Sequence, residues 1–132
     1  MPAWSPRVLL ATTALLTALP VPASPPALFP SSEALPRVVL GEEGRRLNAA
    51  GDRVYAEGLS GRAARNYYLL RPGPAITGHS GERLGRSTIA LGKATLISRG
   101  QPALLRILQA RREIRPGDYL LAINPERSDA DG

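Results

Sequence analysis

After Pro36 the chain consists of short apolar runs separated by turn sequences rich in glycine and proline. Within several runs apolar and polar side chains alternate, a period typical of strands with one buried face. In Gly51–Gly58, for example, Val54 and Ala56 would share a face. The other runs are Arg37–Leu40, Asn66–Arg71, Ser87–Ser98 and Tyr119–Ile123. Short strands with turn signals at near-regular spacing predict an all-β domain, built as a small barrel or sandwich.

The run Ser87–Ser98 is the longest candidate strand, and its alternation changes phase in the middle. A β-bulge at Gly92–Lys93 would shift the pattern by one residue, because a bulge adds a residue to one strand of a pair. The positions that would then share one face are Ile89, Leu91, Ala94 and Leu96.

The segment Gln101–Ile114 fits two patterns. Leu104, Ile107 and Leu108 recur at helical spacing, and Pro102 suits a first helical turn. The same segment also alternates as a strand would, with position 105 on the same face as position 107. The local pattern leaves helix and strand open.

Two Arg-Pro-Gly sequences, beginning at Arg71 and at Arg115, predict tight turns. Pro at the second position and Gly at the third satisfy a type II turn, in which Gly supplies the positive φ. The first turn would end the strand that begins at Asn66. In the second, Asp118 would be the last residue of the turn, with no His, Cys or carboxylate at a spacing that suits catalysis.

The first residues have the composition of a secretory signal. Arg7 supplies a positive charge, Val8–Leu19 is uncharged and mainly apolar, and small residues precede a possible cleavage before Ser24. The apolar run is shorter than the roughly 20 residues that cross a bilayer. A core helix of a cytosolic protein is the alternative. We expect export to the periplasm and no integral membrane segment.

On this interpretation the sequence has four parts. A signal peptide occupies residues 1–23, a small β-barrel domain residues 37–124, and a disordered tail residues 125–132. The repeated prolines of residues 24–36 predict an extended, poorly ordered linker between signal and domain.

Few residues are suited to catalysis. The chain has no cysteine, which excludes disulfides, thiol nucleophiles and Cys-based metal sites, and it has one histidine. His79 is next to Ser80, but Glu82 stands where a nucleophile elbow requires glycine. The spacing of Gly85 and Gly92 does not fit a phosphate-binding loop. We expect a non-enzymatic protein with no catalytic residues, no cofactor and no metal.

The chain is basic, with 17 Lys and Arg against 11 Asp and Glu and a formal net charge of +6. Such a surface favours anionic partners: acidic protein patches, acidic glycans, anionic lipid or nucleic acid. Because export would separate the protein from nucleic acid, we expect no nucleic-acid partner.

The segment Gly61–Arg71 alternates basic and aromatic residues. Aromatic rings beside basic side chains can bind sugar rings or single-stranded nucleic acid. The residues of this possible contact surface are Arg62, Arg65, Tyr67, Tyr68 and Arg71. The plainer interpretation is a half-buried strand that has one tyrosine in the core and follows a basic loop.

Five segments in series resemble the C-terminal β domain that follows a LysM module in bacterial envelope proteins. They are GDRVYAEGL, YYLLRPG, GERLG, IALGKATLI and REIRPGDYLL. That group includes the secretin-associated protein of type IV pili, and its domain is related to the C-terminal domain of flagellar assembly protein T. The resemblance implies a small SH3-like barrel of about six short strands, in which Gln101–Ile114 is mainly strand. It also implies a periplasmic protein that acts through protein contacts.

Between the signal and Arg37 the chain has only the Pro-rich stretch and no LysM module, so peptidoglycan binding by that module is not expected. We expect a periplasmic accessory domain that docks on an envelope complex of the secretin or flagellar-ring type, or on a peptidoglycan-associated protein. One alternative is a binder of anionic envelope polymer, peptidoglycan or lipopolysaccharide, through the arginines near Arg62–Arg71. Another is a β-clip chaperone-like domain of pilus or flagellar assembly, which strand order would separate from the barrel.

Overall fold

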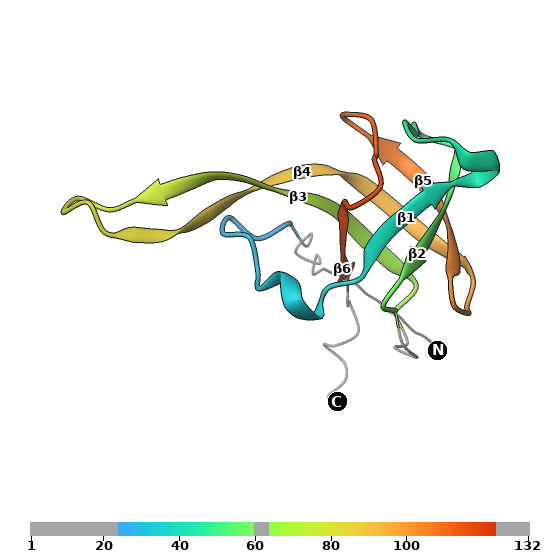
Figure 1. The fold of residues 1–132 in the computed structure, drawn as a ribbon, viewed down its shortest axis with the longest axis horizontal. Helices are drawn as coiled ribbons and strands as arrows, with labels where there is room; N and C mark the ends of the chain where they lie inside the picture. The colour runs from blue at the N-terminus through green and yellow to red at the C-terminus, as the bar shows by residue number, and fades with distance from the viewer. Residues whose placement is uncertain (1–23, 60–63, 124–132) are drawn as a thin grey trace, which may run out of the picture.

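Six antiparallel strands form one sheet that closes into a ring, in the order β1-β2-β5-β4-β3-β6 (Figure 1). The computed structural model describes residues 24–59 and 64–123. The strands are β1 (Arg37–Gly41), β2 (Arg53–Glu57), β3 (Asn66–Thr77), β4 (Arg83–Ser98), β5 (Ala103–Ala110) and β6 (Tyr119–Ile123). Two short 3-10 turns, η1 (Ser32–Ala34) and η2 (Glu42–Gly44), flank β1. The predicted small all-β barrel is confirmed.

The barrel interior is filled by alternate side chains of the strands. In β2 the buried residues are Val54 and Ala56, as their alternation predicts. In β5 they are Ala103, Leu105 and Ile107, so this segment is a strand and its helical spacing has no structural counterpart. The helical pattern arose because Leu104 and Leu108, on the outer face, are also apolar. Because every second side chain is buried, the strand pattern is correct and the helical pattern is not.

Strand β4 contains the predicted phase shift. Leu69 and Leu70, neighbours in β3, pair with Gly92 and Ala90, so Leu91 is the extra residue on β4. The buried positions on either side of the shift are Leu91, Ala94 and Leu96, and Ile89 packs against the same core. The phase shift is therefore confirmed, and the extra residue is Leu91, one position before the predicted Gly92–Lys93.

Strand β3 does not end at Arg71, and the turn predicted there is wrong: the strand continues through Pro72-Gly73-Pro74 to Thr77. Pro72 pairs with Thr88, whose N–H points away from β3 because it donates to the Ala27 carbonyl, 3.2 Å. The missing N–H of Pro72 therefore faces the outer edge of β3, where no ladder bond is lost. Beyond Leu70, β3 and β4 leave the barrel as a two-stranded ribbon (Figure 1).

Residues 24–36, expected to form a linker, lie against the barrel and the ribbon. Leu28 forms an isolated bridge with Ser87 of β4, and Phe29 N–H donates to the Arg86 carbonyl at 2.8 Å. The Phe29 ring meets the ring of Tyr119 edge-on, with centroids 5.2 Å apart. These contacts make the segment part of the folded unit.

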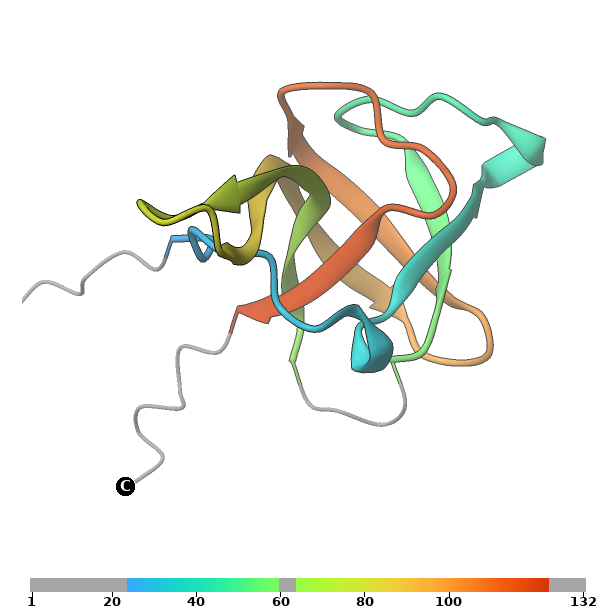
Figure 2. The same ribbon diagram turned by 60° about the vertical axis from the view of Figure 1, so that its left-hand side comes forward.

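Strands β1 and β6, the two ends of the barrel sequence, close the ring (Figure 2). Arg37 pairs with Tyr119. Val38 N–H donates to the Asp118 carbonyl and Gly117 N–H donates to the Val38 carbonyl, both at 2.8 Å. The closed ring is the strand order expected of a barrel.

The predicted signal (residues 1–23) and the predicted tail (residues 125–132) lie outside the described residues. Within residues 24–59 and 64–123, no helix has the length and hydrophobicity needed to cross a membrane.

Candidate functional site

The turn between β5 and β6 contains Asp118, one of the two buried polar or charged residues in the part of the chain that the structure describes. Asp118 N–H donates to the Arg115 carbonyl at 3.1 Å, and Gly117 has a φ of 94°. This positive φ is the one that a type II turn requires at its third residue, so the predicted turn is confirmed. Glycine is needed here because a side chain would be strained in that conformation.

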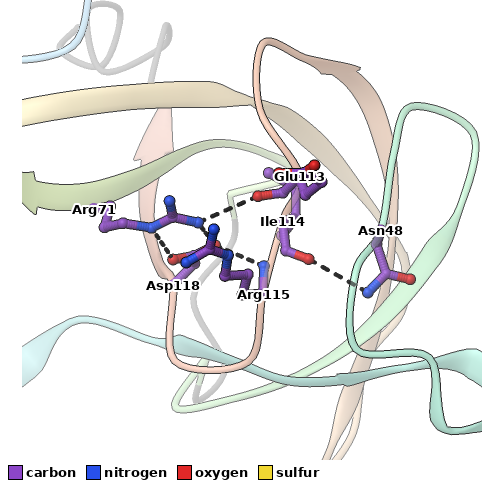
Figure 3. A network of polar contacts seen from close by, with 6 residues as sticks. All are labelled: Asn48, Arg71, Glu113, Ile114, Arg115 and Asp118. Carbon is purple, nitrogen blue, oxygen red and sulfur yellow. Dashed lines mark hydrogen bonds and ion pairs between the residues drawn. The ribbon is translucent and has the colours of Figure 1, made fainter.

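Asp118 has a second role, which the sequence did not reveal. Its carboxylate accepts two hydrogen bonds from Arg71, Nε to Oδ1 and Nη2 to Oδ2, each 2.8 Å long (Figure 3). Oδ2 also accepts from the backbone N–H of Arg115 at 2.7 Å. The side chain of Asp118 is 5% exposed and that of Arg71 21%. Two parallel bonds between guanidinium and carboxylate fix the position of β3 relative to the turn.

The environment of Arg71 is consistent with a permanent ion pair. Its hydrogen bonds with Asp118 raise the pKa of Arg71, and the charges of Asp118 and Glu113 act in the same direction against the opposing effect of burial. Arg71 Nη2 also donates to the Glu113 carbonyl at 3.2 Å. The Asp118 carboxylate, for which the sequence offered no catalytic partner, is thus bound by three donors of the protein itself.

Asn48 connects the β1–β2 loop to the same turn region. Its backbone pairs with Ile114 through bonds of 3.0 and 2.8 Å, and its side-chain Nδ2 donates to the Arg45 carbonyl at 3.2 Å (Figure 3 shows its side chain near Ile114). Asn48 is 1% exposed. A Cβ on Gly41 would lie 2.3 Å from Asn48 Oδ1, so only glycine leaves room for this amide. Nothing in the sequence singled out Asn48, because its partner is 66 positions away.

The residues of the expected basic and aromatic contact surface do not share one face. Arg62 lies outside the described residues. Tyr67 faces the core and its hydroxyl donates to the Ala64 carbonyl at 3.1 Å, whereas Tyr68 lies on the opposite face and is 5% exposed. Arg71 is paired with Asp118, and Arg65 is exposed. Neither tyrosine ring is open for stacking on a ligand, so this arrangement agrees with the plainer interpretation of the segment.

Tyr68 yields a first prediction, because its buried hydroxyl has no hydrogen-bond partner among the described residues. Tyr68→Phe removes an unpaired polar atom, so the free energy of unfolding at neutral pH should stay the same or rise by up to about 1 kcal/mol. Burial raises the pKa of Tyr68 above its usual 10.0. The folded state therefore keeps this proton when the unfolded chain has lost it, and stability should fall as the pH rises above that value.

Urea denaturation at neutral pH and near pH 11 measures both effects. The phenylalanine variant should lose less stability on the change to alkaline pH than the parent chain does. A loss above about 1 kcal/mol at neutral pH would contradict the prediction, since it would indicate a partner for the hydroxyl.

His79 and Ser80, which the sequence analysis considered for a hydrolase site, belong to a turn. His79 and Ser80 lie at the tip of the β3–β4 ribbon, where Gly81 N–H donates to the Gly78 carbonyl and Ser80 N–H to Glu82 Oε1. In the part of the chain that the structure describes, no group of three or more His, Cys, Asp or Glu could hold a metal ion.

Two depressions lie beside the Asn48–Ile114 bridge. The first, of about 180 Å³, is lined by Glu42, Glu43, Arg45, Asn48, Gly51, Asp52 and Arg53. Its charges are largely paired: Arg53 with Glu42 at 3.0 Å and Arg45 with Asp52 at 3.6 Å. The second is an open depression of about 340 Å³, lined by Ala49, Ala110, Arg111, Arg112 and Glu113. We call it the arginine depression.

No protein-family model matches the chain, and no curated protein shows significant similarity to it. Its function therefore has to be inferred from the surfaces that the barrel presents.

Proposed function

We propose that the chain is a non-enzymatic accessory domain of the cell envelope, which docks in the periplasm on a protein assembly of the secretin or flagellar-ring type. The observation that supports docking is the β3–β4 ribbon, which extends beyond the barrel and contributes nothing to its core beyond Ile89 (Figure 1). A two-stranded ribbon is only marginally stable by itself in water, so added contacts must hold it extended.

Several contacts across the ribbon supply this rigidity. Arg86 Nε donates to the Gly73 carbonyl at 2.8 Å, and Ser87 Oγ donates to the Pro74 carbonyl at 3.2 Å. The segment that contains Leu28 adds backbone bonds along β4. On the other edge, prolines of β3 remove backbone donors, which limits unspecific strand pairing.

The ribbon and the N-terminal segment that lies against it also expose apolar side chains. Leu84 of β4 is 51% exposed, and Leu28 of that segment is 47% exposed. A Cβ placed on Gly85 would lie 3.4 Å from Leu28 Cδ2, so Leu28 lies over this glycine. A rigid projection that carries exposed leucines is suited to a protein contact, because burying both side chains would remove apolar surface from water. Envelope placement rests on the signal-like N-terminus and on the family resemblance.

Site-specific cross-linking in the native host tests this proposal. A photoreactive residue at Leu84 should cross-link to an envelope protein in the membrane fraction, and one at Arg106, exposed on β5, should not. N-terminal sequencing of the isolated chain should show a mature start near Ser24. Recovery of an uncross-linked chain, free in the periplasm or in the cytosol, would count against the proposal.

A second candidate function is binding of anionic envelope polymer, which the net charge of +6 favours. Co-sedimentation with peptidoglycan at two salt concentrations tests it, since salt screens exposed charges. Failure to co-sediment at either concentration would eliminate this candidate.

A further inference from the structure

We propose that the arginine depression binds an acidic peptide segment of a partner protein, with Arg111 and Arg112 as the side chains that hold its carboxylates. This inference rests on the proposed docking function and names the chemistry of a second contact surface, apart from the ribbon.

The two arginines stand on a well-anchored segment. Ala110, the last residue of β5, pairs with Gly92, and Arg111 N–H donates to the Leu91 carbonyl at 2.6 Å. Three residues further on, Ile114 is joined to Asn48 by two backbone bonds. Both ends of the Arg-Arg pair are therefore fixed, which lowers the entropy that is lost when a ligand binds.

The charge of these arginines is not balanced by the protein. Three other arginines near this end of the barrel have carboxylate partners: Arg45 with Asp52, Arg53 with Glu42 and Arg71 with Asp118. Arg111 and Arg112 are exposed and form no ion pair with any residue in 24–59 or 64–123. Unpaired guanidinium groups can receive carboxylates through two parallel hydrogen bonds.

One acidic residue, Glu113, also lines the depression. Its charge raises the pKa of Arg71, and its carbonyl accepts a bond from the same guanidinium. Against the charges of Arg111 and Arg112, this single carboxylate leaves the lining of the depression with an excess of one positive charge.

The shape favours a short peptide segment over a long polyanion. The small side chains of Ala49 and Ala110 leave a volume of about 340 Å³, at the lower end of the range for ligand sites. Arg65, another exposed arginine, precedes the end of β3 that pairs with Ile123, whereas Asp118 and its turn lie at the other end of β6. Arg65 and the turn of Asp118 are thus at opposite ends of the barrel.

Titration calorimetry of the exported chain with a hexaglutamate peptide tests the inference. Binding should saturate and weaken as salt is added. The double variant Arg111→Gln/Arg112→Gln should bind at least about tenfold more weakly. The matched variant Arg65→Gln/Arg83→Gln removes the same charge from exposed positions elsewhere, and its affinity should change less than about twofold. Thermal unfolding should confirm that both variants are folded.

Three results would overturn the inference. Equal losses in the two double variants would indicate a general charge effect, and absence of saturable binding would remove the site. Tighter binding of polygalacturonate, or of phosphatidylglycerol vesicles, through the same two arginines would assign the depression to a glycan or a membrane surface. Each result can be separated from failure of the docking function, because that function is tested by cross-linking at Leu84.

Discussion

Gly92→Ala should unfold the domain or lower its free energy of unfolding by more than about 3 kcal/mol, beyond the usual range for an overpacked methyl group. A Cβ at this position would lie 1.9 Å from the Gln109 carbonyl oxygen and 2.9 Å from Ala110 Cα. Both atoms belong to the backbone of β5, where Ala110 pairs with Gly92 and Gln109 pairs with Lys93 of β4. Strand β5 therefore cannot move away from the new methyl group without breaking its ladder with β4.

Gly51→Ala is the matched control. Gly51 has a φ of 94°, but a Cβ added there would meet no atom within 4 Å. The change should therefore lower the free energy of unfolding by only about 1 kcal/mol, the strain of an alanine in the left-handed conformation. Urea denaturation of the two variants measures the difference. A cost for Gly92→Ala as small as that of the control would contradict the close approach of β4 and β5.

Asp118→Ala should lower the free energy of unfolding by about 3 kcal/mol. It leaves the Arg71 guanidinium, which is largely buried, without its bidentate partner, and it also removes the acceptor for Arg115 N–H. The turn itself would keep Gly117 and the bond from residue 118 to the Arg115 carbonyl. The expected loss of stability therefore comes from the ion pair. Urea denaturation measures the free energy of unfolding of this variant.

Two comparisons isolate the ion pair. Glu42→Ala breaks the more exposed pair with Arg53, with side chains 33% and 40% exposed, and should cost less than about 1 kcal/mol. The double variant Arg71→Met/Asp118→Ala should cost less than the sum of the single changes, because the second change no longer removes a contact. Additive effects, or an Asp118→Ala cost within about 0.5 kcal/mol of zero, would show that the pair contributes little.

The strands could be predicted where their signal is local. Alternation in β2, the apolar run of β6 and the phase shift in β4 each depend on residues within a few positions of one another. For β5 the pattern was ambiguous, and the family resemblance favoured a strand; the structure confirms the strand, while the family itself stays a proposal. The end of β3 could not be predicted, because the effect of Pro72 depends on which side of the strand has a neighbour.

The polar network of the turn could not be predicted from the sequence for a related reason. Arg71 and Asp118 are 47 positions apart and meet only because β3 and β6 are neighbours in the ring. The Tyr67–Tyr68 pair shows the reverse case. Adjacent residues of a strand point to opposite faces, so the period of two already argues against one stacking surface made of both rings.

The closure of the ring by β1 and β6 has a consequence for when the domain can fold. The strands that complete the ring are the first and the last of the sequence, so the hydrogen bonds between them join residues far apart along the chain. Contacts of this kind form slowly, because a long loop must be ordered first. A chain that crosses a membrane from its N-terminus cannot complete this barrel until β6 has followed. For a chain that is exported as we propose, this topology would delay folding until translocation of the domain is finished.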